Sequence, residues 1–441
     1  KKSKAMTKKI KVGFYVQNEG YPNVDCRFPE KGNPGIGGTQ FSEIATAYYL
    51  NKFYPDRVEI LLLANITELL PPSLQSCHIV DAVDAAVKSE DQGCDIFIFR
   101  SSFLTQDLYE KLCSLKIKAI ARSDNFPTIE ELKRMVDCSQ IKCHVCVGQE
   151  ELDMYRDHRI FEKSTRIFHP FNIETYASKN DIIKQGNTVV YLGSLDPAKQ
   201  FHVLARVWSH ILAKKPEAKL IVIGSGKVYN RNQKLGKWGV AEEAYEANYI
   251  RPFLSDENGD VIKSVHFSGL LGAEKTEILQ TADVGVVSPT GSTETFCISG
   301  VEIQACGTPV VSAAKGGLLD TVVHGKTGLL GRSDRDLIRN ILYSLDNPDV
   351  ARQFGQNGIN FVREKFDYRL IIKEWLELFI DVYNNRPAKP QPMKPNYLYQ
   401  AKFLREGMRI LKKNIPLLRG VPSLVEIKSQ IKEILTKILK F

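Results

Sequence analysis

The sequence of 441 residues predicts an α/β protein in which two doubly wound parallel sheets are followed by a basic helical extension. Short apolar runs alternate with helical stretches twice along the chain, and this alternation is typical of parallel sheets. The length is sufficient for two domains with separate cores. We expect the two sheet domains at 10–176 and 188–366, a last helix at 367–385, a proline-rich linker at 386–395 and a tail at 396–441.

The first sheet is predicted from five apolar runs, and a glycine-rich loop follows its first strand. Strands are expected at 10–16, 58–63, 95–99, 118–121 and 144–147, with helices between them such as 106–115 and 128–136. The loop runs from Gly35 to Gln40 and precedes a helix. Gly37 and Gly38 in this loop would allow the backbone to approach a ligand closely.

The second sheet shows the same alternation. Strands are expected at 188–192, 219–223, 265–269, 284–287 and 310–311, and helices at 198–212, 298–306, 333–345, 348–365 and 368–383. A polar loop, 288–293, follows the fourth of these strands. In an open parallel sheet, ligands bind at the carboxyl ends of the strands, so this loop is a candidate binding segment.

Two glutamates, Glu294 and Glu302, bracket the start of the helix predicted at 298–306. Free backbone N–H groups at the start of a helix hold anions such as a diphosphate well. Glu302 on the helix could accept hydrogen bonds from a ribose diol, and Glu294 in the loop ahead of it could reach a sugar hydroxyl. The segment expected to line this site consists of Thr295, Phe296, Cys297 and Ile298.

The residues around the two glutamates resemble a known donor-site signature. The string E-x-F-x-I-x-x-x-E-x-x-x-x-G-T-P-V-V, followed by G-G and then H-G-K-T-G-L-L, is similar to that of retaining family 4 glycosyltransferases of the GT-B fold. A pair of glutamates alone is more often solvated surface, but here the spacing, the glycines and the helix stop agree. The resemblance covers roughly residues 10–385 and implies two Rossmann-like domains that face a cleft.

A second element resembles the same family with two departures. The segment from Gly193 to Lys199, GSLDPAK, is similar to the family's G-R-L-x-x-x-K-G, whose arginine and lysine hold the donor diphosphate. Lys199 matches, whereas Ser194 replaces the arginine and Gln200 the second glycine. Ser194 could still donate one hydrogen bond, but a positive charge is lost, so another cation would have to compensate.

The resemblance also implies what surrounds the donor. The glycine loop of the first domain would lie near the phosphates and the acceptor, and the backbone around Gly224 would surround the nucleotide base. Many relatives carry a histidine after the strand near 118–124 that reaches the transferred sugar. This chain has no histidine there, so Arg122, Ser123 or Asp124 would occupy that place, and the sequence does not decide among them.

These observations predict a metal-independent hexosyltransferase that uses a nucleotide diphosphate sugar, UDP-linked, and no cofactor. Lys199, Ser194 and the helix start would stabilise the charge on the leaving diphosphate, while Glu294 orients the sugar and Glu302 binds the ribose. The family retains the anomeric configuration, and its leaving phosphate takes the acceptor's proton, so no side-chain base is assigned. A lipid-linked or envelope glycan, such as a lipopolysaccharide or capsule precursor, is the expected acceptor.

Other classes of function remain open at this stage. Nucleotide-sugar epimerases share the two-domain architecture but would bring their own acids and a histidine to the cleft. Phosphorylases would show a lysine that attaches pyridoxal phosphate, and none is marked here. The lost arginine and histidine favour a third alternative, a non-catalytic scaffold that binds sugar nucleotides.

The composition of the chain indicates the class of protein and the compartment in which we expect it. Apolar residues make up 43% and charged residues 25% of the chain, as in ordinary globular proteins. No apolar run approaches the 18 or so residues of a membrane-spanning helix; we expect no secretory leader, and KKSKA before Met6 is set aside as an added segment. Nine scattered cysteines predict a reducing cytoplasm. Cys143 and Cys146 have the spacing of half a zinc site but fall on a predicted strand, so we interpret them as core packing.

The net charge of +9 is concentrated at the two ends of the chain. Residues 386–441 carry 13 lysines and arginines but three acids, so the body is not basic and no nucleic-acid partner is expected. Apolar residues of the tail recur at helical spacing among these cations. Such helices can lie on an anionic membrane, here the inner face of the cell membrane, or cover the body or a partner subunit. The charge favours the membrane.

Overall fold

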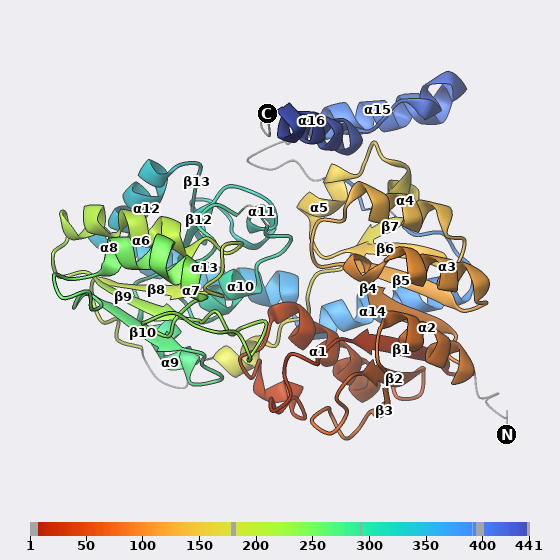
Figure 1. Ribbon diagram of the computed structural model, residues 1–441, viewed down its shortest axis with the longest axis horizontal. Coiled ribbons are helices and arrows are strands. Elements are labelled where there is room, and N and C mark those ends of the chain that lie inside the picture. Colours follow the sequence, from red (N-terminus) through yellow and green to blue (C-terminus); the bar gives the residue numbers. More distant parts are fainter. Residues whose placement is uncertain (1–7, 178–181, 292, 390, 394–400, 439–441) are drawn as a thin grey trace.

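The structure is a computed structural model that describes residues 8–438 apart from 178–181, 292, 390 and 394–400. Its described residues form two parallel sheets, each covered by helices on both faces, which lie beside one another (Figure 1). The predicted linker and tail boundaries at 395 and 396 lie outside the described residues.

The first sheet has the strand order β3-β2-β1-β4-β5-β6-β7, with every pair of neighbours parallel. Its strands are β1 (Ile10–Val16), β2 (Val58–Ala64), β3 (Gln75–His78), β4 (Ile96–Arg100), β5 (Lys118–Ser123), β6 (Ile141–Cys146) and β7 (Ser164–Arg166). The connecting helices are α1 (Gly38–Phe53), α2 (Ala82–Asp91), α3 (Gln106–Ser114), α4 (Ile129–Asp137) and α5 (Gln149–Met154). Buried apolar residues on both faces are expected for a parallel sheet, and β1 and β4 have almost no exposed positions.

The second sheet has the order β10-β9-β8-β11-β12-β13 and is also parallel throughout. Its strands are β8 (Thr188–Leu192), β9 (Lys219–Ile223), β10 (Val265–Gly269), β11 (Val284–Val286), β12 (Val310–Ala313) and β13 (Gly328–Gly331). Its helices are α6 (Phe201–Leu212), α7 (Glu243–Tyr245), α8 (Arg251–Leu254), α9 (Lys275–Thr281), α10 (Ile298–Ala305), α11 (Leu318–Thr321), α12 (Asp334–Asp346) and α13 (Pro348–Phe366). One turn of π-helix, 246–250, joins α7 to α8.

Helix α14 (Tyr368–Tyr383) begins next to the second domain but packs against the first. The chain crosses where Phe171 and Phe366 are hydrogen-bonded, since the Phe171 N–H donates to the Phe366 carbonyl at 2.9 Å. Trp375 and Phe379 of α14 are buried in the same core cluster as Phe14 of β1. This agrees with the expectation that the last helix of the body would pack back across the two domains.

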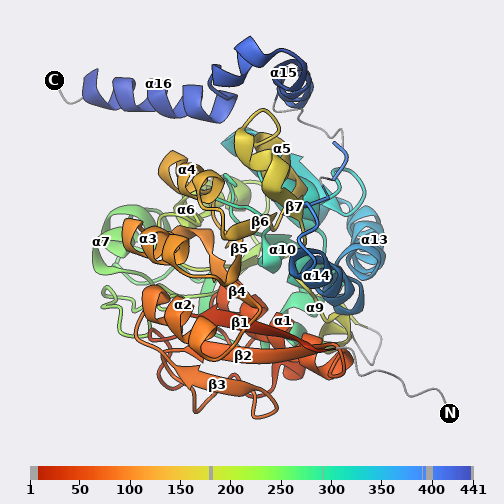
Figure 2. The same cartoon turned by 90° about the vertical axis from the view of Figure 1, so that its right-hand side faces the viewer.

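Two tail helices follow, α15 (Lys402–Asn414) and α16 (Leu424–Ile438). Both lie over the first domain on the side of α4 and α5, and α16 extends beyond the body (Figures 1 and 2). α15 contacts α5, and α16 contacts α4. No helix in the described part of the chain is both long and apolar enough to cross a bilayer.

The strands predicted at 10–16, 188–192, 219–223 and 265–269 are confirmed with the same bounds. Other expectations were wrong in detail. The first helix begins at Gly38, inside the glycine loop, and α6 begins at Phe201 because the segment from Ala198 forms turns. The elements β3, β7 and α2 were not predicted. β3 and β7 are edge strands of four and three residues, too short to show a periodic pattern.

We predict that Trp375→Ala lowers the free energy of unfolding by about 3–5 kcal/mol, because it leaves a cavity where α14 packs on the first sheet. Trp375 is 2% exposed. Leu370→Ala on the same helix is the control, since Leu370 is 45% exposed and its loss should change stability by about 0.5 kcal/mol or less. Urea denaturation followed by circular dichroism measures both. Equal effects of the two variants would contradict this packing.

Candidate functional site

A cavity of about 450 Å³ lies between the two domains, at the carboxyl ends of strands from both sheets. The first domain contributes the start of α1, Asp124 after β5, and His169 beyond β7. The second domain contributes the loops after β8, β9, β10 and β11 together with the start of α10. The location is the one expected for a ligand site in open parallel sheets.

Most of the predicted site residues line this cavity. They are Gly38, Ser194, Lys199, Gly224, Glu294, Thr295, Phe296, Cys297, Ile298 and Glu302. Gly37 is not among the lining residues, and a Cβ atom there would lie 3.0 Å from the ring of Tyr229, which does line the cavity. Gly224 has φ +147°, and a Cβ atom there would lie 1.8 Å from the Gly193 carbonyl oxygen. Glycine is therefore required at 224 by the approach of the neighbouring loop as well as by its backbone conformation.

Lys199 and Glu294 form an ion pair at the wall of the cavity, with 2.7 Å between Nζ and Oε1. Burial lowers the pKa of Lys199, but the charge and hydrogen bond of Glu294, together with Tyr229, raise it, so the net direction is upward and the ammonium stays charged. The sequence predicted separate roles for these residues, with Lys199 on the diphosphate and Glu294 on the sugar. Their pairing shows that both groups reach the same part of the cavity.

Glu302 is the centre of a second buried pair. Its Oε1 accepts hydrogen bonds from Lys275 Nζ at 2.7 Å and from the Tyr176 hydroxyl at 2.5 Å. Burial, with the Glu302 carboxylate next, raises the pKa of Tyr176 well above its usual value, so the hydroxyl stays a donor. Lys275 lines the cavity and was missed, because its position at the start of α9, after β10, carries no motif. It is a candidate for the cation that replaces the missing arginine at Ser194.

The start of α10 lies at the interface between the domains. Cys297 precedes the helix with φ +73°, in the left-handed region that non-glycine residues rarely adopt. The neighbouring Thr295 Oγ1 donates a hydrogen bond to the Asp124 carbonyl of the first domain at 2.7 Å. The loop with Glu294 is thus fixed to both walls of the cavity. Strain held in place by such contacts is common at ligand sites.

His169 reaches the cavity from the first domain, at a position that the sequence did not indicate. Its Nδ1 is 2.6 Å from Ser42 Oγ, and its Nε2 is 3.6 Å from Asp124 Oδ1. Burial lowers its pKa to about 4, although the Asp124 carboxylate acts in the opposite direction. The imidazole is therefore neutral at pH 7. A predicted strand ending just before His169 would have indicated that this residue lies at the ligand edge of the sheet. β7 is too short to be predicted from the sequence, so this signal was missing.

The three residues considered for the place of the missing histidine differ in position. Asp124 lines the cavity, whereas Arg122 and Ser123 are buried behind it. Arg122 holds Asp124 with 2.9 Å between Nε and Oδ2, and its NH2 nitrogen is 3.3 Å from Glu43 Oε1. Of the three alternatives, Asp124 is thus the one that could meet a ligand.

The Cys143 and Cys146 side chains lie in different core clusters on the two faces of the first sheet, in agreement with the core-packing interpretation. Among the described residues, His144, Cys146 and Glu151 come close enough to hold a metal ion. However, both ring nitrogens of His144 already lie within 2.9 Å of serine hydroxyls. This donor set fits a hydrogen-bonded core better than a metal site, and metal independence of the protein stays a prediction.

Residues 172–361 match the family model described as glycosyl transferases group 1. This segment contains the second sheet and all the predicted residues of the donor side. Among curated proteins, the chain is similar to trehalose synthase of Thermococcus litoralis, with 25% identity over 278 residues, 55% of this chain and 63% of that protein. It is also 30% identical to D-inositol 3-phosphate glycosyltransferase 2 of Catenulispora acidiphila over 175 residues, 39% of this chain and 38% of that protein. The chain thus spans less than two thirds of the length of these relatives.

Solved structures with the same arrangement cover most of the chain. Sucrose-phosphate synthase from Thermosynechococcus elongatus superposes with a TM-score of 0.65 and 16% identity, over 85% of this chain and all of that one. The structure of Anabaena HepE in complex with UDP-glucose superposes with a TM-score of 0.60 and 17% identity, over 84% of this chain and 100% of that one. The likeness shows the fold. The chain has the two facing Rossmann-like domains of the GT-B fold, as its sequence predicted, with a helical extension after them.

We predict that acidification destabilises the protein in part through His169. Its pKa is lowered to about 4 in the folded state, so between pH 6.5 and 4 the unfolded chain binds a proton that the folded protein excludes. Stability is fully present above pH 6.5 and falls as the pH decreases through this range. From pH 7 to pH 5 the wild type should lose about 2 kcal/mol more than His169→Gln.

Urea denaturation at the two pH values measures this difference. His210→Gln replaces an exposed histidine of α6 and should keep the wild-type pH dependence. If His169→Gln also kept it, the imidazole would not be held neutral by burial.

Proposed function

We propose that this protein is a retaining glycosyltransferase that transfers a hexosyl unit from a nucleotide diphosphate sugar to an acceptor hydroxyl. The observation that carries the proposal is the pair of lysine–glutamate contacts at the start of α10, in a cavity between two Rossmann-like domains. The group 1 match and the names of the similar proteins support the same class. No residue is assigned as a metal ligand.

The donor side would work by electrostatic stabilisation. Breaking the bond between the sugar and the diphosphate leaves negative charge on the phosphate oxygens. Lys199, Lys275 and the N–H groups at the start of α10 are fixed before the reaction and would stabilise this charge, Ser194 adding a hydrogen bond. Glu294 would then turn to a sugar hydroxyl and Glu302 to the ribose. Pairing with Lys199 and Lys275 in the free protein holds both carboxylates in position.

The acceptor side would be the wall formed by the first domain. A neutral His169 can exchange hydrogen bonds with a sugar hydroxyl, and the Asp124 carboxylate beside it accepts them. We assign His169 the place of the histidine that relatives carry after β5. Because the acceptor's proton would pass to the leaving phosphate, His169 positions the sugar and is not a general base.

UDP is the proposed nucleotide, because the solved structure of HepE, which has the same fold, contains UDP-glucose. The proposed acceptor is a glycan or lipid-linked glycan of envelope polysaccharide synthesis, which would place the enzyme in the cytoplasm at the inner face of a membrane. The names of the curated relatives offer other small acceptors, a sugar or an inositol phosphate, as competing candidates.

Calorimetric titration of UDP, GDP and ADP tests the donor site. We expect one nucleotide to bind the wild type, and Glu302→Gln to weaken that binding by about tenfold or more, which corresponds to roughly 1.4 kcal/mol. Glu277→Gln, on the exposed side of α9, is the matched control and should bind like the wild type. Absence of binding by all three nucleotides at millimolar concentration would exclude the proposed function.

The catalytic part of the proposal predicts a different effect for Lys199. Lys199→Met should lower the rate of UDP release from a UDP-sugar with acceptor by about a hundredfold, the usual cost of losing one group that stabilises transition-state charge. Lys214→Met removes an exposed lysine of the same domain and should leave the rate unchanged. If the wild type bound UDP but released no UDP from any UDP-sugar with any acceptor tested, the result would instead support a non-catalytic scaffold.

A further inference from the structure

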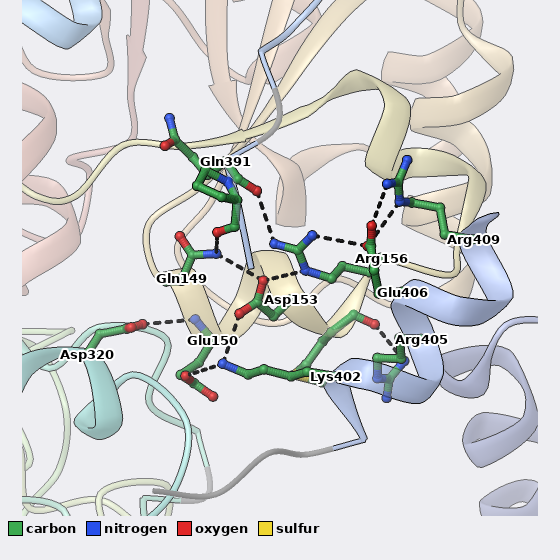
Figure 3. A network of polar contacts seen from close by, with 12 residues as sticks. Gln149, Glu150, Asp153, Arg156, Asp320, Gln391, Lys402, Arg405, Glu406 and Arg409 are labelled. Atoms are coloured by element: carbon green, nitrogen blue, oxygen red, sulfur yellow. Dashed lines mark hydrogen bonds and ion pairs between the residues drawn. The ribbon is translucent and has the colours of Figure 1, made fainter. Parts of the chain in front are cut away.

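The tail helix α15 binds the body through its charged side chains. Lys402 Nζ lies 2.7 Å from Glu150 Oε1 and 2.8 Å from Asp153 Oδ2, both on α5. One turn later Arg405 pairs with Asp157 at 2.9 Å and donates to the Met154 carbonyl at 2.7 Å. Figure 3 shows Lys402 between the two carboxylates, with Arg405 beside it. Both cations are 1% exposed.

This contact is part of the folded body, because the carboxylates beneath it are buried. Burial raises the pKa of Glu150 to about 8, with Asp320 adding to the effect and Lys402 opposing it. Arg156 joins the same network, from Asp153 at 2.7 Å to Glu406 of the tail at 3.2 Å (Figure 3). Removing the tail would take Lys402 from buried Asp153 and Arg405 from buried Asp157, which is unfavourable.

The start of α16 is fixed to the same surface. The Leu424 N–H donates to Asp157 Oδ2 at 2.6 Å, and Val425 packs against the core of the first domain. Glu426 accepts from the Ser423 hydroxyl and N–H at 2.6 Å each, which caps the helix. Beyond this point the described side chains of α16 are exposed, and the helix runs past α4 along the top of the body in Figure 2.

The apolar side of the tail faces outward as a result. Lys412 Nζ also donates to the Asp157 carbonyl at 2.9 Å. A helix turns about 100° per residue, so the docked positions 402, 405 and 412 lie on the other side of α15 from Leu404, Ile410 and Leu411. In α16 the apolar side lies away from Val425, which contacts the body. We call eight of the exposed apolar residues of the tail the tail stripe: Leu404, Ile410, Leu411, Leu417, Ile427, Ile431, Ile434 and Leu435. Leu417, between the helices, is 89% exposed.

The charges beside the tail stripe are positive. Lys413, Arg419, Lys428 and Lys432 are exposed. Of the three acids in the tail, Glu406 and Glu426 are partly buried and engaged in the contacts above, and exposed Glu433 is paired with Lys437 at 2.7 Å. An exposed apolar stripe rimmed by cations matches the boundary between acyl chains and anionic head groups.

We propose that the tail stripe is the surface by which the folded protein binds an anionic lipid bilayer, lying in its interface without crossing it. The described helices are not suited to span a bilayer, and the stripe on α16 can enter the acyl region while lysines on its flanks reach the head groups. A second copy of the chain fits less well, because it would bring like-charged lysines together. The proposal does not depend on the reaction at the cleft.

Sedimentation of the full chain with lipid vesicles tests this surface. Vesicles of phosphatidylglycerol and phosphatidylcholine should bind the protein at least tenfold more tightly than vesicles of phosphatidylcholine alone. Binding should weaken by at least tenfold when the ionic strength rises from about 0.05 M to 0.5 M, since the Debye length shortens severalfold. Equal binding to both vesicle types, or no binding to either, would overturn the proposal.

Two variants separate the apolar and the charged contributions. Ile427→Ser with Ile431→Ser and Ile434→Ser, and Lys428→Gln with Lys432→Gln, should each reduce binding to anionic vesicles by at least tenfold. All five side chains are exposed, so both variants should melt at the wild-type temperature. An unchanged affinity of either variant would contradict the proposed surface.

Matched controls change the same residue types elsewhere. Ile183→Ser replaces an isoleucine that is 84% exposed near the second domain, and Lys214→Gln with Lys326→Gln removes two exposed lysines of that domain. Both should bind vesicles like the wild type. Analytical ultracentrifugation tests the competing outcome. If the wild type formed a dimer that the triple isoleucine variant did not form, and if the wild type did not bind vesicles, the tail stripe would be an interface between copies of the chain.

Discussion

Pairing of charges in places with little water is the constraint on which this structure depends. A carboxylate buried between two domains is costly unless a cation and further donors satisfy it. At the cleft, Lys199 satisfies Glu294, and Lys275 together with Tyr176 satisfies Glu302. The pairs keep four ionisable groups ordered in the free protein. An anionic ligand that binds Lys199 or Lys275 must take the place of the glutamate paired with that lysine. Ligand binding is therefore coupled to a rearrangement of these side chains.

The same constraint explains the tail. An amphipathic helix usually buries its apolar side, but α15 contacts the body with Lys402 and Arg405. Leaving the buried acids beneath it without cations would cost more free energy than leaving the apolar side of α15 exposed. The apolar side is then left to face outward. A helix inverted in this way is fixed to the body by strong polar contacts and still presents apolar surface to a partner. If that partner is a membrane, the first domain, which carries the proposed acceptor side, is held close to it.

At the first-domain wall of the cavity, a histidine comes from a different part of the chain from the one that the family resemblance implied. The segment after β5 has no histidine, but His169, which follows β7, stands beside Asp124 at the same cavity. The carboxyl ends of the strands in a parallel sheet lie along one edge. Loops that follow different strands can therefore place a side chain in the same cavity. Lys275 likewise lines the cavity from the second domain, where Ser194 stands at the position of the family's arginine.

The sequence by itself determined the two parallel sheets, most of their strands and the donor segment from Glu294 to Glu302, because local periodicity and spacing carry this information. It did not reveal the short edge strands β3 and β7, whose few residues are held by neighbours and not by a pattern of their own. Only the tertiary structure decided that Lys199 meets Glu294, that Lys275 and His169 enter the cavity, and that α15 docks by its charged side. These contacts join residues from 27 to 255 positions apart. Such pairings are set by packing and by the cost of unpaired buried charge, which no single segment encodes.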